Sequence, residues 1–290
     1  GDSCIDQIHP SAIIHPGAKL SEGVRVGPFC VVGPNAVIGP GVTLHSHVVV
    51  SGHTTIGADS IVFSHAVIGA EPQDRKFAGE TSFLSIGRRC RIFEFAHLSG
   101  GTRGGGGLTA VGDGCLIMSH THIGHDCTLG SDVVLASGSS LAGHVVVGDG
   151  ATIAGHSCVH QRVSIGVGSF LAGASVLVDD LIPYGLAIGN RASLHSLNLR
   201  GIRRSRIPSH EQRALLRTFR YVFQPPTDGF YSALQLPPMR ALQDRASASQ
   251  RDLSNYPHVM GMLSFVLGQR PHPSNRALCR PPAITPATST

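Results

Sequence analysis

Aliphatic residues recur at every sixth position through most of the first 190 residues. One series runs from Ile8 to Ile68 in steps of six and a second runs from Val111 to Leu177, and every member is Ile, Leu or Val. A shorter series lies between them: Ile86, Ile92 and Leu98. Self-similarity at a fixed period is the signature of a solenoid. With three repeats in each triangular coil, the pattern predicts a parallel β-helix whose coils stack about 4.8 Å apart.

Small residues occupy two further positions of the repeat. Glycine often follows the aliphatic residue, as at Gly27 and Gly57, where we expect it to permit a tight turn at a corner. The fourth position after the aliphatic residue is small or β-branched and should also point inward. Four of the seven cysteines share that position: Cys30, Cys90, Cys115 and Cys127. We interpret them as small buried hydrophobes, and their spacing, which gives no disulfide framework, favours a reducing compartment.

The six-residue register breaks twice. Residues 70–85 and 99–110 fit neither series, and insertions of this kind project from a solenoid as loops that often carry function. The second break contains four consecutive glycines at positions 104–107. This run lacks the spacing of a phosphate-binding loop and no helical pattern follows it, so we expect a flexible loop. The β-helix with its two loops is therefore assigned to residues 1–190.

The periodicity changes after Gly189, where helical spacing predicts a small α-helical C-terminal domain over residues 191–270. Its strongest segment has five apolar residues at helical spacing: Leu215, Leu216, Phe219, Val222 and Phe223. Weaker helical patterns cover residues 238–246 and 257–267. Residues 271–290 are rich in Pro, Ser and Thr and are expected to be a disordered tail.

Charge divides between the two parts of the chain. Residues 191–290 contain 14 Arg against 4 Asp or Glu, whereas residues 1–190 contain 9 Lys or Arg against 14 Asp or Glu. The basic third is a candidate surface for an anionic partner. No nucleic-acid-binding motif or aromatic platform accompanies the arginines, so a nucleotide pyrophosphate or an acidic carrier protein is favoured over nucleic acid. No apolar run approaches the ~18 residues of a membrane span, which predicts no stable membrane insertion.

Seventeen histidines are more than a solenoid core requires. His125, His144 and His160 lie 19 and 16 residues apart, so coils of about 18 residues place them near one edge of three successive coils. The aliphatic register assigns the interior to other positions, and these side chains should lie outside the core. Asp126 directly follows His125, an arrangement that suits a general base. Gly143 offers a backbone N–H for an oxyanion, and the lack of a nucleophile signature favours direct acyl transfer without a covalent intermediate.

Six strings are specific enough to indicate a family: VGPFCVVGP, SHVVVSGHTTIG, PQDRKFAGE, HIGHDCTLG, LAGHVVVGD and VHQRVSIG. With them, residues 8–206 resemble the UDP-N-acetylglucosamine O-acyltransferases that begin lipid A biosynthesis. The resemblance implies a left-handed β-helix and a homotrimer with active sites between subunits. It implies transfer of an (R)-3-hydroxyacyl group from the phosphopantetheine of acyl carrier protein to the 3-hydroxyl of UDP-N-acetylglucosamine, with no cofactor and no metal.

The resemblance also implies roles for individual residues. His125 would be the general base, with Asp126 orienting it and Gly143 supplying the oxyanion donor. The residues expected to line the acyl and sugar-nucleotide site are Gln73, Asp74, Lys76, His122, His144, His160 and Gln161. Gly173 stands where the family gauges acyl length and leaves room for a long chain. The expected nucleotide contacts are Asn198, Arg203 and Arg204.

Three positions depart from the family pattern: Arg191, Arg200 and Ser205. Arg200 replaces an acidic residue, which puts a different charge where the family contacts the nucleotide. The divergent C-terminal domain, the excess of Arg over Lys and a first residue other than Met suggest a plant mitochondrial homologue from which a targeting segment has been removed. The bacterial cytoplasm is the alternative location.

Other functions stay open on the same scaffold. A sister enzyme would acylate the amino group of a UDP-amino sugar. A zinc enzyme resembling the γ-type carbonic anhydrases would use His120 and His125, which four residues separate, with a third ligand from another coil. A third alternative is a structural solenoid that has lost its activity.

Overall fold

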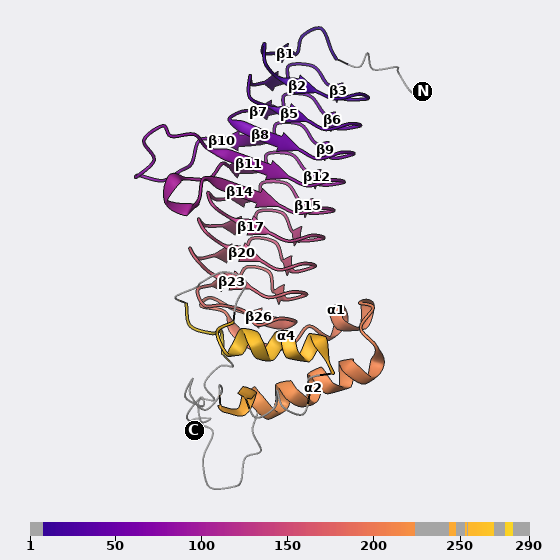
Figure 1. Ribbon diagram of the computed structural model, residues 1–290, viewed down its shortest axis with the longest axis vertical. Coiled ribbons are helices and arrows are strands. Elements are labelled where there is room, and N and C mark those ends of the chain that lie inside the picture. The colour runs from indigo at the N-terminus through magenta and orange to yellow at the C-terminus, as the bar shows by residue number, and fades with distance from the viewer. Residues whose placement is uncertain (1–7, 224–243, 248–252, 254, 270–275, 281–290) are drawn as a thin grey trace, which may run out of the picture.

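The computed structural model describes residues 8–223, 244–247, 253, 255–269 and 276–280. Its first part is a left-handed parallel β-helix (Figure 1), which confirms the fold predicted from the six-residue period. The chain passes through three parallel sheets in turn, here called B, C and A. Two-residue strands predominate because each six-residue repeat spends the rest of its length on a corner.

Sheet B has nine strands: β1(Ile13–Ile14), β4(Val31–Val32), β7(Val49–Val50), β10(Val67–Ala70), β13(His97–Ser99), β16(His122–Ile123), β19(Ser140–Leu141), β22(Cys158–Val159) and β25(Val176–Leu177). Sheet C has eight: β2(Lys19–Leu20), β5(Val37–Ile38), β8(His53–Ile56), β11(Phe83–Ile86), β14(Leu108–Val111), β17(Thr128–Leu129), β20(Val146–Val147) and β23(Ser164–Ile165). Sheet A has ten: β3(Arg25–Val26), β6(Thr43–Leu44), β9(Ile61–Val62), β12(Arg91–Ile92), β15(Leu116–Ile117), β18(Val134–Leu135), β21(Thr152–Ile153), β24(Phe170–Leu171), β26(Gly185–Ile188) and β27(Ser193–Leu197).

Three corners join the sheets, and each is named after the two sheets that it connects: the BC, CA and AB corners. Parallel pairing keeps equivalent residues of successive coils in columns. At the BC corner, for example, β16 pairs with β19 and β19 pairs with β22. A residue on a corner is therefore flanked by the residues that occupy the same place one coil above and one coil below.

Inward-facing aliphatic side chains fill the space between the three sheets. Both six-residue series are buried from Val26 onward, and Ile38, Ile117 and Leu141 have no exposed surface. Ile8, at the open N-terminal end, is 44% exposed because no coil covers it. The four cysteines predicted to point inward are buried, and all the described cysteines are free thiols.

The glycines that follow the aliphatic residues serve a different purpose from the predicted one. Gly57 does not adopt a positive φ, and a Cβ at this position would lie 2.5 Å from the backbone carbonyl carbon of Gly87 in the next coil. The left-handed turn falls two residues later, at Asp59, whose φ is 58°. The prediction that these glycines form the tight turn is wrong: they are required because neighbouring coils approach closely.

Both breaks in the register project from the BC corner (Figure 1). One loop covers residues 71–82 between β10 and β11, and the other covers residues 100–107 between β13 and β14 and contains the short 3-10 helix η1(Arg103–Gly105). Each loop is shorter than predicted. β11 and β14 begin inside the segments 70–85 and 99–110 because each pairs over four residues with its neighbour.

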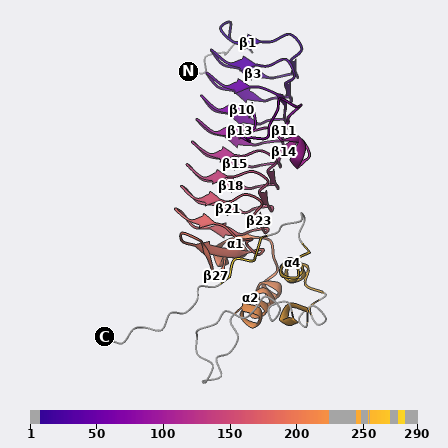
Figure 2. The same ribbon diagram turned by 90° about the vertical axis from the view of Figure 1, so that its left-hand side faces the viewer.

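Helices close the C-terminal end of the β-helix (Figures 1 and 2). They are α1(Leu199–Arg204), α2(Ser209–Phe223) and α4(Pro257–Val266), and residues 244–247 are helical too. β27 pairs antiparallel with β26 and so covers the last edge of sheet A. The helices predicted from apolar spacing are confirmed, although residues 238–243 lie outside the described part. None of the helices among the described residues is both long and apolar enough to cross a membrane.

Residues 276–280 correct the prediction of a disordered tail. Leu278 and Cys279 are each 1% exposed, and Leu278 forms a parallel bridge with Asp180 at the end of the β-helix. Backbone hydrogen bonds of 2.7 Å join Asp180 to the segment on both sides of that bridge. A composition rich in Pro, Ser and Thr does not reveal this pairing, because its partner lies almost a hundred residues away in the sequence. The other residues of 271–290 lie outside the described part.

Replacing Ile117 with Ala should lower the free energy of unfolding by about 2–5 kcal/mol, because the side chain is fully buried and the cavity cannot close. Ile13 is 56% exposed and provides a matched control, so Ile13→Ala should change stability by less than about 0.5 kcal/mol. Urea denaturation of both variants measures the difference. Similar losses for the two would contradict the assignment of the series to the interior.

Candidate active site

His125 and Asp126 form a hydrogen-bonded pair at the BC corner, directly after β16. The corner holds Asp126 in the left-handed region, with a φ of 60°. His125 Nδ1 lies 2.7 Å from Asp126 Oδ2. Because a carboxylate only accepts, this hydrogen bond assigns the imidazole proton to Nδ1 and leaves the lone pair on Nε2. The pair therefore presents Nε2 as a proton acceptor.

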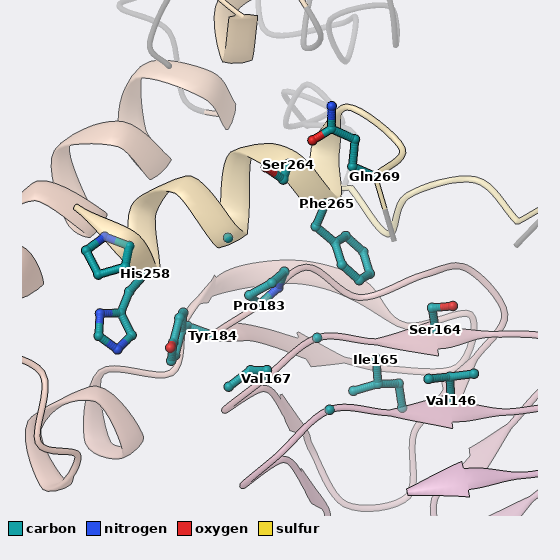
Figure 3. Close-up of a pocket in the computed structure, with 14 residues that line it drawn as sticks. Val146, Ser164, Ile165, Val167, Pro183, Tyr184, His258, Ser264, Phe265 and Gln269 are labelled. Atoms are coloured by element: carbon teal, nitrogen blue, oxygen red, sulfur yellow. The ribbon is translucent and has the colours of Figure 1, made fainter. Parts of the chain in front are cut away.

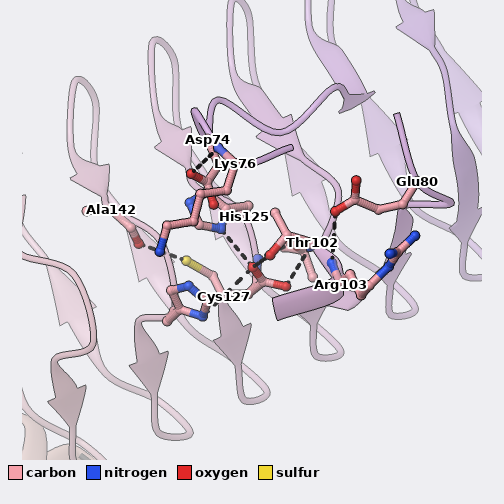
Figure 4. A network of polar contacts seen from close by, with 11 residues as sticks. Asp74, Lys76, Glu80, Thr102, Arg103, His125, Cys127 and Ala142 are labelled. Carbon is pink, nitrogen blue, oxygen red and sulfur yellow. Dashed lines mark hydrogen bonds and ion pairs between the residues drawn. The ribbon is translucent and has the colours of Figure 1, made fainter. Parts of the chain in front are cut away.

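The glycine-rich loop, which carries Thr102 (Figure 4), holds the Asp126 carboxylate in place. Thr102 donates to it twice, from N to Oδ1 at 2.7 Å and from Oγ1 to Oδ2 at 2.6 Å. The N–H of Asp126 donates in turn to Thr109 Oγ1 at 2.8 Å. His125 and Asp126 are only 6% and 7% exposed. They lie outside the solenoid core, as predicted, yet the loop shields them from water.

The glycines at 104–107 are needed for this close approach. A Cβ on Gly105 would overlap the Asp126 carboxylate, whereas a Cβ on Gly104 would meet nothing within 4 Å. Glu80 on the other loop accepts a hydrogen bond from Arg103 N at 3.2 Å, which joins the two insertions. The prediction of a flexible loop is therefore wrong: the run is ordered, and its backbone passes directly over Asp126.

Gly143 lies one coil beyond His125, at the equivalent place on the corner. A Cβ at Gly143 would lie 2.5 Å from both Cε1 and Nε2 of His125, so glycine is what allows the imidazole to rest on the backbone. Gly143 is buried, and its N–H donates to no group in the described part of the chain. The residue on which the His125 ring rests therefore has a backbone N–H with no acceptor in the described part of the chain.

Two further histidines surround His125. The ring of His144 meets it edge-on with centroids 5.0 Å apart, and His144 Nδ1 is 3.8 Å from Asp126 Oδ2. The ring of His122 stacks on His97, with the two Nδ1 atoms 3.1 Å apart. The site therefore contains a group of imidazoles around one carboxylate.

Burial sets the charge of these neighbouring rings. It lowers the pKa of His122 from 6.5, and the neighbouring imidazoles of His97 and His125 lower it further. Burial also lowers the pKa of His144 from 6.5, with Arg162 adding to the effect. Both rings are consequently neutral at neutral pH and can donate or accept hydrogen bonds without carrying charge.

The loop of residues 71–82 crosses the same corner. It carries three of the predicted site residues: Gln73, Asp74 and Lys76. Gln73 and Lys76 are exposed, whereas Asp74 is half-buried and accepts a hydrogen bond from Lys76 N at 3.0 Å. Figure 4 shows Asp74 and Lys76 beside His125. The negative charge of Asp74 also acts on the pKa of His144, which places this carboxylate within electrostatic reach of the histidines.

The predicted ladder of His125, His144 and His160 is only approximate. The strand register makes Gly143 and Gln161 the residues equivalent to His125. His160 is one place out of this column and is exposed, as is Gln161. Both lie at the BC corner, two coils from His125. Arg276 contacts both, with its Nη2 2.5 Å from His160 Nδ1 and its Nε 3.1 Å from the Gln161 carbonyl oxygen.

The remaining predicted site residues lie elsewhere in the subunit. Gly173 follows β24 at the AB corner, where it is exposed and where a Cβ would come no closer than 3.4 Å to any other residue. Asn198 lies against the CA corner: its Nδ2 donates to Gly168 O at 3.0 Å, and its Oδ1 accepts from Gly201 N at 3.0 Å to cap α1. Arg203 and Arg204 are exposed at the end of α1.

Of the positions that depart from the family pattern, Arg200 lies in α1, Ser205 caps its C-terminal end, and Arg191 lies between β26 and β27. Ser205 ends α1 by donating from Oγ to Ile202 O at 2.6 Å, while Arg191 and Arg200 are exposed. Within one subunit, the predicted site residues are therefore spread over different corners of the β-helix. Those that lie near His125 are the ones at the BC corner.

Within the described residues, one cluster has the ligand types and spacing of a metal site: His125, Asp126 and His144. The Asp126 carboxylate in it already accepts hydrogen bonds from His125 and Thr102. His120, the other ligand of the predicted zinc pair, lies at the AB corner, where it stacks on Phe95 with centroids 4.9 Å apart. The pairing of His120 with His125 as zinc ligands is therefore wrong.

An apolar cavity of about 400 Å³ lies between α4 and the last coils of sheet C (Figure 3). Its walls include Val146, Ile165, Tyr184 and Phe265. None of the predicted site residues lines it, so the cavity and the histidine cluster are separate features. The cluster contains the proton acceptor and the unpaired donor, and it is the candidate active site.

Three contributors to this site were not identified from the sequence: Thr102, Thr109 and Arg276. Thr109 lies in the second break of the register, and only its pairing in β14 shows that it points inward. Thr102 and Arg276 carry no signal in the sequence, because they reach the site from a glycine-rich insertion and from the C-terminal segment, neither of which follows the repeat.

Comparison with known proteins finds matches in both parts of the chain. A model described as UDP N-acetylglucosamine O-acyltransferase, domain 2, matches residues 180–279, and the bacterial transferase hexapeptide model matches residues 7–40 and 109–143. The acyl-[acyl-carrier-protein]–UDP-N-acetylglucosamine O-acyltransferase of a Sulfurovum species is 45% identical over 195 residues, which is 67% of this chain and 73% of the relative.

Solved structures extend the similarity over almost the whole chain. The UDP-N-acetylglucosamine acyltransferase of Campylobacter jejuni is 37% identical with a TM-score of 0.83, covering 94% of this chain and 99% of its own. The Arabidopsis UDP-N-acetylglucosamine acyltransferase is 31% identical with a TM-score of 0.78, covering 94% and 100%. With the family models, the Sulfurovum relative and the solved structures in agreement, the chain belongs to the family of UDP-N-acetylglucosamine O-acyltransferases.

Proposed function

We propose that this enzyme transfers an (R)-3-hydroxyacyl group from acyl carrier protein to the 3-hydroxyl of UDP-N-acetylglucosamine, the first step of lipid A biosynthesis. The observation that carries the proposal is the buried His125–Asp126 pair resting on Gly143, with Nε2 free to accept a proton. The relatives support the substrates, since they are named for acyl carrier protein and UDP-N-acetylglucosamine. They are O-acyltransferases, so the amino-sugar alternative is not favoured.

The reaction needs only one proton acceptor and one oxyanion donor. Nε2 of His125 takes the proton of the sugar 3-hydroxyl while that oxygen attacks the thioester carbon. The Gly143 N–H donates to the oxyanion of the tetrahedral intermediate. When the C–S bond breaks, the imidazolium returns the proton to the leaving phosphopantetheine thiolate. Asp126 keeps Nδ1 protonated and stabilises the imidazolium between the two proton transfers.

The other corner residues are proposed to bind substrate rather than react. The neutral rings of His122 and His144 can hydrogen-bond the sugar or the acyl hydroxyl. The charged side chain of Lys76 suits the nucleotide phosphates, and Gln73, Asp74, His160 and Gln161 extend the polar surface along the same corner. The chain itself supplies every group that the reaction uses, so no cofactor is proposed.

Association into a homotrimer would complete the site. Gly173, Asn198, Arg203 and Arg204 are proposed to measure the acyl chain and bind the nucleotide, but they lie away from the BC corner of their own subunit. A neighbouring copy of the chain can bring such residues to His125. Rings stacked along the AB corner support such a contact, because Phe29 and Phe95 are 59% and 51% exposed in the single subunit.

The location of the enzyme stays a prediction. Most relatives are bacterial, which agrees with the bacterial cytoplasm, and the plant mitochondrion is the other location expected from the sequence. The proposed chemistry is the same in both.

Replacing His125 with Ala should lower kcat for acyl transfer by about 10²–10⁴-fold, because no other group takes the hydroxyl proton. The assay follows acylation of UDP-N-acetylglucosamine with a panel of 3-hydroxyacyl carrier proteins. His15→Ala is the matched control, since His15 is exposed on the first coil of the β-helix, many coils from His125, and it should keep wild-type activity. Sedimentation should give a trimer for both variants. Wild-type turnover by His125→Ala would refute the general-base assignment.

Gly105→Ala should lower kcat by about tenfold or more, since its Cβ displaces the loop that positions Asp126. Gly104→Ala lies in the same run but has open space around it and should remain within about twofold of wild type. Steady-state kinetics of the two variants distinguish a loop that positions Asp126 from a flexible loop that does not. Equal activities would favour the flexible loop.

Acid should weaken the fold through the buried histidines. Burial lowers the pKa of His97 and His122 from 6.5, so below pH 6.5 the unfolded chain binds protons that the folded chain does not. The free energy of unfolding should therefore be fully developed above pH 6.5 and fall as the pH is lowered from there. Denaturant titrations above and below this pH measure the fall. It should be smaller in a His97→Gln, His122→Gln double variant, and an equal fall would contradict the assignment.

A further inference from the structure

The C-terminal segment 276–280 is held in place by contacts that do not involve the side chain of its first residue, Arg276. Backbone hydrogen bonds connect the segment to Asp180 and to Leu194 N, which donates to Arg280 O at 2.7 Å. Leu278 and Cys279 are buried, and Cys279 Sγ lies 3.1 Å from Ala192 O. The fixed position of this segment therefore depends on its backbone and on two apolar side chains.

This anchoring directs Arg276 back to the BC corner. Its guanidinium bridges two consecutive residues, with Nε donating to Gln161 O at 3.1 Å and Nη2 2.5 Å from His160 Nδ1. More than a hundred residues of sequence separate the arginine from this pair, so the contact is a property of the folded C-terminal end. Gln161 continues the column of corner residues that begins at His125 and Gly143, and His160 stands one place before it.

The contact determines where His160 carries its proton. Arginine remains protonated in proteins and can only donate. Nδ1 of His160 must therefore accept, and the neutral ring carries its proton on Nε2. This is the opposite tautomer from that of His125, whose Nδ1 donates to Asp126. One corner thus presents a proton acceptor at His125 and a hydrogen-bond donor at His160.

We propose that Arg276 is a positioning residue for acyl transfer: it fixes the ring and tautomer of His160, so that Nε2–H is offered to an oxygen of the bound substrate, and it braces the Gln161 backbone. The proposal rests on the proposed function, since it assumes that His160 faces substrate. Arg276 itself acts through His160 and Gln161. The C-terminal segment is in this sense part of the active site.

A double-mutant cycle tests the coupling in the full-length enzyme. Arg276→Ala should lower kcat/KM for UDP-N-acetylglucosamine by about tenfold, the scale of a lost hydrogen bond to a charged group. In a His160→Ala background the same change should have a clearly smaller effect, because only the contact with the Gln161 backbone is then left to lose. Equal effects in the two backgrounds would overturn the proposal.

Two further variants separate positioning from charge and from folding. Arg280→Ala, in the same segment, is the matched control and should stay within about twofold of wild type. Arg276→Lys keeps the positive charge but cannot reproduce the two-point fork, so it should be as impaired as Arg276→Ala. Full activity of the lysine variant would contradict the claim that Arg276 must make both hydrogen bonds from one guanidinium group. The thermal midpoint of Arg276→Ala should match that of wild type, and a kinetic loss explained by unfolding would also count against positioning.

A spectroscopic measurement tests the tautomer even if the acyl transfer assay fails. In protein labelled with ¹⁵N-histidine, the ring signals missing from His160→Ala identify His160. They should report a proton on Nε2 in the wild type and a mixture of tautomers in Arg276→Ala. An Nδ1 proton in the wild type would refute the proposal, whereas loss of acyl transfer by the wild type itself would refute only the proposed function.

Discussion

The close stacking of the coils is the constraint on which the rest of the molecule depends. Neighbouring backbones run at the spacing of paired strands, about 4.8 Å, and every coil must repeat the same path to keep that pairing. At Gly57 the approach is so close that a single Cβ would strike the next coil. The same closeness places corner residues in columns, each in contact with the equivalent residue above and below. Gly143 illustrates the consequence: it is glycine because the ring of His125 lies on it.

Stacking alone leaves a corner open to water, and the two insertions change this. They leave the β-helix at the BC corner and return to it, tied together by Glu80 and Arg103. Their main effect on the chemistry passes through Asp126, whose carboxylate receives hydrogen bonds from Thr102 and His125. A buried carboxylate needs such partners to stay ionised. The loop that excludes water from the pair therefore also supplies the hydrogen bonds that make its burial tolerable.

Local periodicity explains why the fold could be predicted and where the prediction ended. The aliphatic series determines which residues point inward, so the burial of Ile117 and the cysteines follows directly from it. It also locates His125 on a corner. The aliphatic series does not predict the contacts that are made by segments outside the repeat. Thr102 reaches Asp126 from an insertion, and Leu278 pairs with Asp180 from almost a hundred residues away. Composition alone therefore misjudged both segments.

The same reasoning applies to the residues that the β-helix leaves apart. The three corners of the β-helix are held apart by the packed core. Gly173 at the AB corner and the arginines of α1 are therefore distant from His125 of the same subunit. Either these residues have no part in the reaction, or a second copy supplies them. The corner of stacked rings between sheets A and B favours the second, because exposed Phe29 and Phe95 gain from being covered.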